Sequence, residues 1–184
     1  DIGIPDKYIE ETESDLEVCF EEDASKFLPR LPAKSYKNSV GSVLVIGGSK
    51  DYYGAPFLAA IAAQRAGAGM VYVAVPQSIA KIPDTSLSLI VAEIDDDNKR
   101  YFCPDSLKDN KLKKLIEKSD IVILGPGIGV ERDTFLFIQS LMKTDKPLVI
   151  DADALNIIAE SPEIYIRNAS NILTPHPGEM RRLL

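Results

Sequence analysis

The sequence predicts an α/β fold of three α/β/α layers around a mostly parallel β-sheet, and three observations support this. Short apolar runs alternate with helical segments, as in sheets whose strands are joined by crossover helices. Most of these runs are apolar throughout, which is typical of strands buried on both faces. Glycine-rich or polar loops directly follow four of them, at the strand ends where open parallel sheets bind ligands.

The alternation begins with a strand predicted over residues 43–46. A helix is predicted over residues 55–66, an alanine-rich run with Pro56 in its first turn and Gly67 just after its end. Proline at the start and glycine beyond the end are the expected helix boundaries.

The following segments continue the alternation with two strands and a helix. A β-rich run at 70–75 stops at Pro76, a further apolar run lies at 87–91, and residues 105–118 have the pattern of a helix with one polar face. The later elements are predicted, in order, as strand 120–124, helix 133–142, strand 148–150, helix 154–160 and strand 171–173.

Charge and composition limit the functional classes. The chain has 184 residues, a net charge of −7 and 45% hydrophobic residues, and nine acids against one base lie within residues 6–23. This acidic balance argues against nucleic-acid binding. The apolar runs fall short of the ~18 residues of a membrane helix, and two cysteines do not suffice for a disulfide framework. We therefore expect a soluble cytoplasmic protein with an acidic segment at 1–23 and a folded body at 24–184.

Four loops are expected to meet at one edge of the sheet, because each follows a predicted strand. These loops are Gly47-Gly48, 125–129, 151–156 and 174–179. Neither glycine loop has the full pattern of a P-loop or of a dinucleotide fingerprint, and each by itself is more typical of a tight turn. Together the four loops favour a small-molecule site.

Three polar residues in these loops have more than one interpretation. Asp151 and Asp153 can hold Mg²⁺ or act as acid and base. We interpret Asp153 as the cap of the following helix, whereas Asp151 is left open between a site residue and the end of a strand. His176 is the single histidine and lies between two prolines. A ligand contact and a structural role both fit it.

Six ordered motifs make the chain, from about residue 28, resemble a known family. They are Gly-Ser-Val-Leu-Val-Ile-Gly-Gly-Ser at 41–49, Tyr-Gly-Ala-Pro at 53–56, Arg-Ala-Gly-Ala-Gly at 65–69, Gly-Pro-Gly-Ile-Gly at 125–129, Asp-Ala-Asp-Ala-Leu-Asn at 151–156 and Thr-Pro-His-Pro-Gly-Glu at 174–179. The chain resembles the ADP/ATP-dependent NAD(P)H-hydrate dehydratases of the ribokinase-like superfamily, in the form of the C-terminal domain of a bifunctional repair enzyme.

The resemblance implies an activity and a set of ligands. The expected reaction is the nucleotide-dependent dehydration of (S)-NADHX and NADPHX to NADH and NADPH by a lyase, with ADP favoured over ATP, with Mg²⁺, and in a homo-oligomer. The residues implied for hydrate binding are Ala55, Gly127 and His176. Weaker candidates are Gly125, Gly129, Asp151 and Asn156.

The resemblance also has limits. Residues 1–5 resemble the end of an epimerase domain, so residues 1–23 are expected to be an interdomain linker. The family's Gly-Thr-Gly-Asp motif does not occur in this sequence, so the ribokinase-like fold is expected to be incomplete at its C-terminus and the catalytic aspartate to lie beyond Leu184. The alternatives are a hydroxyethylthiazole or hydroxymethylpyrimidine kinase and a non-catalytic nucleotide-binding fragment.

Overall fold

The computed structural model describes residues 3, 5, 7–8, 11–12, 20–27, 34, 40–79, 88–165 and 170–184. The chain divides into two compact units, residues 1–34 and residues 35–184. In the first unit, helix α2 (Glu21–Phe27) has three acids in its first turn and Lys26 in its last turn, an order that favours the helix dipole. Most of the predicted acidic segment lies outside the described residues.

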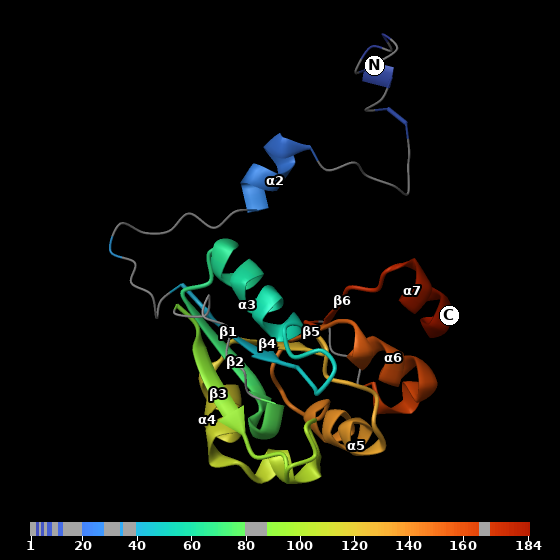
Figure 1. Cartoon of the computed structure of the whole chain (residues 1–184). Helices are drawn as coiled ribbons and strands as arrows, with labels where there is room; N and C mark the ends of the chain where they lie inside the picture. The colour runs from blue at the N-terminus through green and yellow to red at the C-terminus, as the bar shows by residue number, and fades with distance from the viewer. Residues whose placement is uncertain are drawn as a thin grey trace. The chain divides into compact units, whose positions relative to one another are not determined.

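A six-stranded sheet forms the centre of the second unit, in the order β3-β2-β1-β4-β5-β6 (Figure 1). All five strand pairings are parallel, which confirms the predicted parallel sheet. The strands are β1 (Ser42–Ile46), β2 (Met70–Pro76), β3 (Ile90–Ile94), β4 (Ile121–Leu124), β5 (Leu148–Ile150) and β6 (Ile172–Leu173).

The helices of this unit are α3 (Ala55–Arg65), α4 (Asn110–Lys118), α5 (Arg132–Leu141), α6 (Asp153–Glu160) and α7 (Pro177–Leu183), with short 3-10 helices η2 (Gln77–Ile79), η4 (Pro104–Lys108) and η5 (Pro162–Ile164). Helix α3 confirms its predicted boundaries, with Pro56 in the first turn and Gly67 just beyond its end at φ +105°. Among the described helices, none has both the length and the apolarity to cross a membrane.

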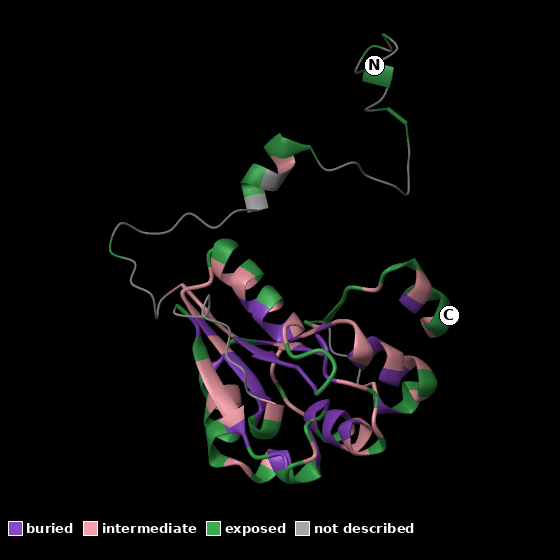
Figure 2. Cartoon of the chain, viewed as in Figure 1, coloured by how far each residue is buried: buried purple, intermediate pink, exposed green. Residues whose placement is uncertain are grey.

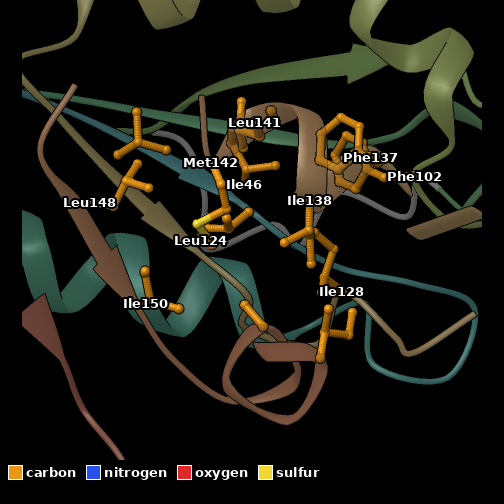
Figure 3. Packing of buried hydrophobic residues seen from close by; sticks show 14 of the residues in the cluster. Ile46, Phe102, Leu124, Ile128, Phe137, Ile138, Leu141, Met142, Leu148 and Ile150 are labelled. Atoms are coloured by element: carbon orange, nitrogen blue, oxygen red, sulfur yellow. The ribbon is translucent and has the colours of Figure 1, made fainter. Parts of the chain in front are cut away.

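Helices cover both faces of the sheet, and alternation along the strands separates two cores. Val45 packs with Phe57 and Ala60 of α3 on one face. On the other face, Leu44 belongs to a larger cluster that includes residues of α4, α5 and α6, such as Phe137. These side chains are almost fully buried. Figure 2 shows buried residues in the strands and along the helices, and Figure 3 shows Phe137 among other members of the larger cluster, such as Phe102 and Ile138. Burial of a Val, Leu or Phe side chain contributes about 1.5–3 kcal/mol of transfer free energy. The three-layer α/β fold predicted from the sequence is therefore confirmed.

Two predicted elements differ from the structure by more than one residue at an end. The single helix predicted over 105–118 is wrong, because the segment splits at Asp109 into η4 and α4. The Asp109 backbone is extended there, and its carboxylate accepts a hydrogen bond from the Lys111 N–H, as a helix cap does. Of the strand predicted over 87–91, residue 87 lies outside the described residues, and the strand runs instead from Ile90 to Ile94. Among the described strands, β3 pairs only with β2, and such an edge position accommodates the polar Glu93.

One carboxylate joins the start of β4 to the start of β1 and gives the first testable prediction. Asp120 Oδ2 accepts hydrogen bonds from both the N–H and the hydroxyl of Ser42, each 2.8 Å long. These bonds lower the pKa of Asp120 below its usual value of 3.8. The carboxylate therefore stabilises the fold above that value, and its contribution is lost as the pH falls through the lowered pKa.

We expect wild type to unfold at a higher urea concentration than Asp120→Asn at neutral pH, and the difference to shrink as the pH falls below about 4. Urea titrations of both proteins at several pH values measure this difference. A difference that stays constant down to strong acid would show that the charge of Asp120 does not stabilise the fold.

Candidate active site

The loops that follow β1 and β4 are in direct backbone contact. The Gly48 N–H donates a hydrogen bond of 3.0 Å to the Pro126 carbonyl. A Cβ atom on Gly47 would overlap the same carbonyl oxygen. The two glycine loops predicted at the edge of the sheet therefore interlock.

The β4 loop is also held against the loop that follows β5. Gly125 has φ +122°, and a Cβ atom on it would overlap the Asp151 carbonyl oxygen and lie 2.7 Å from the Ala154 Cβ. At the other end of the loop, the Gly129 N–H donates a hydrogen bond of 3.0 Å to Asp153 Oδ2. Only glycine combines this close approach with a positive φ.

The interpretation of Asp153 as a helix cap is wrong. No side chain caps the N-terminus of α6, because the Asp153 carboxylate accepts the Gly129 N–H instead. The backbone residue before the helix, Ala152, has φ +51°, a conformation costly for a residue with a Cβ. Such strain is concentrated at functional sites, and here it lies between the two aspartates.

Asp151 connects β5 to the fourth loop. The Thr174 hydroxyl donates a hydrogen bond of 2.9 Å to Asp151 Oδ1. With this contact, each of the four loops is bonded to the next. The prediction that the loops meet at one edge of the sheet is therefore confirmed. The carboxylates of Asp151 and Asp153 have different partners, and the described residues contain no cluster of three acids, cysteines or histidines suited to a metal ion. The described residues therefore do not fit a magnesium centre built from the protein alone.

Ala55 and Gly127, two of the residues implied for hydrate binding, are brought together. A Cβ atom on Gly127 would lie 3.1 Å from the Ala55 Cβ and 2.5 Å from the Tyr52 carbonyl oxygen, and φ is +64°. Gly127 is buried, yet within the described chain its N–H has no hydrogen-bond acceptor, and the Ala55 N–H at the start of α3 has none either. Buried unpaired N–H groups are rare, and a helix N-terminus favours anions. The pair can therefore bind a negatively charged or carbonyl oxygen.

Glu131 supplies an acceptor at the end of the β4 loop. Its Oε2 atom is buried without a hydrogen-bond partner among the described residues and lies against Gly129. The sequence contains no signal for this role, because an acid just before a helix is ordinarily a cap. Here Glu131 occupies the N-cap position of α5 without making a side-chain cap bond.

His176 has a structural role at the start of α7. Its Nδ1 atom accepts hydrogen bonds from the N–H groups of Gly178 (3.0 Å) and Glu179 (3.3 Å). A neutral ring therefore has its proton on Nε2, which lies 3.3 Å from Glu179 Oε1. Glu179 Oε2 in turn accepts the His176 N–H at 2.9 Å, so the two residues form a capping box at the start of α7.

The structure does not join His176 to the other two implied residues. His176 follows β6, two strands away from β4 in the sheet, and its described hydrogen bonds and ion pair do not reach Ala55 or Gly127. Its side chain is 63% exposed. Nearby, Asn156 Oδ1 accepts a hydrogen bond of 2.9 Å from Arg182 Nε, so its oxygen joins α6 to α7.

A groove that lies beyond β6 differs from the four loops in the polarity of its lining. Its volume is about 680 Å³, and its lining side chains are mostly apolar. They are Ile158, Ala159, Pro162, Tyr165, Leu173, Pro175, Met180 and Leu183. Because the groove offers few hydrogen-bonding groups, the loops at the carboxyl ends of β1, β4 and β5 are the better candidate for a polar ligand.

The family of the chain follows from its similarity to known proteins. The family model described as NAD(P)H-hydrate dehydratase matches residues 43–184. The chain belongs to the NAD(P)H-hydrate dehydratase family. It is 37% identical, over its whole length, to a bifunctional NAD(P)H-hydrate repair enzyme of Dictyoglomus turgidum, of which it covers 36%. It is 36% identical to an ADP-dependent (S)-NAD(P)H-hydrate dehydratase of Nitrosopumilus maritimus, with 86% of this chain and 54% of that protein covered.

Solved structures confirm the ribokinase-like fold. A ribokinase-like superfamily protein of Enterococcus faecalis superposes with a TM-score of 0.69 at 22% identity, over 84% of this chain and 51% of that one. The chain thus spans about half the length of that structure and of the ADP-dependent dehydratase, and about a third of the bifunctional enzyme. All six family motifs lie within the shared region or at its edge.

Proposed function

We propose that this chain forms the hydrate-binding part of an NAD(P)H-hydrate dehydratase that uses ADP as its phosphoryl donor. The observation that carries the proposal is the unpaired N–H of buried Gly127 beside the start of α3 at Ala55. These donors suit the oxygens of a dinucleotide substrate, and the buried Glu131 oxygen suits one of its hydroxyl or amide donors. The name of the relative from Nitrosopumilus maritimus supports ADP as the donor.

The proposed reaction replaces a poor leaving group with a good one. The nucleotide transfers its terminal phosphoryl group to the hydroxyl of NADHX, whose proton is taken by a base. The carbon–oxygen bond then breaks, phosphate leaves with the bonding electrons, and loss of a ring proton restores NADH. We propose that the loops of this chain bind and orient the hydrate, whereas the base belongs to the Gly-Thr-Gly-Asp motif, which this sequence lacks. Mg²⁺ is expected to accompany the nucleotide phosphates.

An absorbance assay tests the proposal on the natural protein that contains this sequence. With NADHX and ADP, absorbance at ~340 nm, where reduced nicotinamide absorbs, is expected to rise until the hydrate is consumed, with no rise when the nucleotide is left out. Hydroxyethylthiazole with ATP serves as the competing substrate. Phosphorylation of the thiazole alcohol without any recovery from NADHX would replace the dehydratase proposal with a small-molecule kinase.

We also propose that His176 contacts the hydrate, a role separable from its capping of α7. His176→Asn retains a capping oxygen, whereas His176→Ala removes it and is expected to lower the free energy of unfolding by about 1 kcal/mol. If the imidazole donates a hydrogen bond to the hydrate, both variants are expected to raise the KM for the hydrate about tenfold. Urea titration and hydrate kinetics measure the two effects. A normal KM in a stably folded His176→Asn protein would limit His176 to its structural role.

A further inference from the structure

Asp96 is a buried carboxylate at the end of β3 that the proposed chemistry does not use. Its residue is 2% exposed. Oδ1 accepts a hydrogen bond of 3.3 Å from the Ser78 N–H. Oδ2 accepts bonds from the Ser78 hydroxyl and from the Arg100 N–H, the latter 2.8 Å long. The Asp96 carbonyl also accepts the Lys99 N–H at 3.0 Å. Residues 95–100 form a short loop with Asp96 near its start. Because the Asp96 carboxylate binds the N–H of Arg100 at the other end, it fixes the two ends of the loop relative to each other.

This loop has an unfavourable backbone. Asp97, Asn98 and Arg100 have φ values of +52°, +55° and +66°. Asp and Asn adopt left-handed conformations more readily than other residues with a Cβ, so the cost falls mainly on Arg100, whose conformation persists only where the surroundings enforce it. The side chains of Asp97, Asn98 and Arg100 are exposed. Buried groups that hold the loop are the Asp96 carboxylate and the Ser106 hydroxyl, which donates a hydrogen bond of 2.7 Å to the Asp95 carbonyl. Of these two, the Asp96 carboxylate is the one that binds the Arg100 N–H.

The loop is attached to both glycine loops of the candidate site. The Arg100 carbonyl accepts a hydrogen bond of 2.9 Å from the Lys50 N–H, directly after Gly47-Gly48-Ser49. Lys99 Nζ lies 2.9 Å from Asp133 Oδ2 in the first turn of α5, which follows the Gly125–Gly129 loop. The bond to Asp133 raises the pKa of Lys99, so Lys99 stays charged at neutral pH.

A continuous series of contacts thus runs from Asp96 to the unpaired Gly127 N–H. From the Arg100–Lys50 bond, the series continues through Gly48, whose N–H donates to the Pro126 carbonyl, the residue before Gly127. We propose that Asp96 is a positioning residue of the hydrate site, which holds the 95–100 loop in its left-handed form and through it sets the place of the Gly127 N–H. This inference rests on the proposed function for its kinetic consequence but not for its structural one.

Asp96→Asn tests the proposal in the natural full-length protein. An asparagine retains one acceptor but presents an NH₂ group to either Ser78 or the Arg100 N–H. Asp97→Asn is the matched control, because it makes the same change in the same loop at a side chain that is 66% exposed. The Asp97 carboxylate lies 3.7 Å from Lys99 Nζ, an exposed pair worth little, and the shorter Lys99–Asp133 bond of 2.9 Å stays in place. Ser78→Ala is a milder variant, since it removes one bond to Asp96 and leaves the bond to Arg100 in place.

Two readouts separate positioning from general destabilisation. In Asp96→Asn, hydrogen exchange of the Lys50 amide is expected to accelerate at least tenfold, and the hydrate KM to rise about tenfold with kcat within about twofold. A merely unstable protein would instead lose active enzyme and therefore kcat. Asp97→Asn is expected to match wild type in both readouts, and Ser78→Ala to accelerate Lys50 exchange by about threefold.

Three results would overturn the proposal. The first is an unchanged rate of Lys50 exchange in a folded Asp96→Asn protein, and the second is a hydrate KM equal to that of wild type in an active Asp96→Asn protein. The third is a rise in hydrate KM in Asp97→Asn as large as the rise in Asp96→Asn. If Asp96→Asn does not fold, Lys50 exchange in Ser78→Ala takes its place, and a rate equal to that of wild type overturns the proposal there too. If wild type has no dehydratase activity, the proposed function fails, while the exchange data, which need no substrate, still test the structural part.

Discussion

Gly125→Ala is expected to lower the free energy of unfolding by about 3–5 kcal/mol, from the combined costs of steric overlap and a positive φ. The added Cβ would overlap the Asp151 carbonyl oxygen and lie 3.1 Å from the Ala154 backbone nitrogen. Both neighbours are backbone or a helix start, so neither can rotate away as a flexible side chain would. The loops after β4 and β5 must therefore separate, which breaks the edge of the sheet where the site lies.

Gly67→Ala measures the cost of a positive φ alone, without steric overlap. Gly67 has φ +105° but nothing within 4 Å of its Cβ position, so its replacement is expected to cost only about 1–2 kcal/mol. Urea titration of both variants measures the difference. Equal destabilisation would show that the close approach of Gly125 to Asp151 contributes nothing beyond the backbone conformation.

Gly127→Ala is expected to reduce kcat/KM for the hydrate about 100-fold, because a displacement of about 1 Å within a site has an effect of this size. A Cβ atom on Gly127 would lie 2.5 Å from the Tyr52 carbonyl oxygen and 2.7 Å from the Tyr52 Cβ. The β4 loop and the start of α3 would have to move apart. The unpaired N–H groups of Gly127 and Ala55 would then lie farther apart, which weakens their binding of one ligand.

Gly67→Ala is the control here too, since it lies at the far end of α3 and also has a positive φ. It is expected to have the kcat/KM of wild type. Initial rates at limiting hydrate concentration give this ratio for each variant. A Gly127→Ala enzyme with normal kcat/KM would place hydrate binding elsewhere on the protein.

Much of this fold could be predicted because its signals are local. The apolar run of β1 and the Pro56 and Gly67 boundaries of α3 involve neighbouring residues only, and the structure confirms them. The prediction of one helix over 105–118 is wrong at Asp109, where a contact with a residue distant in the sequence competes with the helical conformation. The Asp109 carboxylate accepts both the Lys111 N–H and, at 3.1 Å, the Asp95 N–H, and the second bond has no signature in the local sequence.

The site was predictable at the level of loops and less so at the level of side chains. Each loop follows a strand, so the topology alone brings the loops to one edge. The hydrogen bond from Gly129 to Asp153, however, joins residues 24 positions apart, and that from the Ser78 hydroxyl to Asp96 joins residues 18 apart. Ala152 and Arg100, both with positive φ, have residue types that predict nothing unusual. Such features depend on tertiary packing, which overrides local preference.

Binding of the hydrate by the Gly127 and Ala55 N–H groups is tested most directly by the backbone amide shifts of the ¹⁵N-labelled protein. NADHX is titrated into this protein without nucleotide. We expect saturable shifts of the Gly127 and Ala55 amides together, while the Gly67 amide stays in place. Stationary Gly127 and Ala55 amides, with saturable shifts at Leu173 and Met180 in the groove beyond β6, would contradict binding at these two groups.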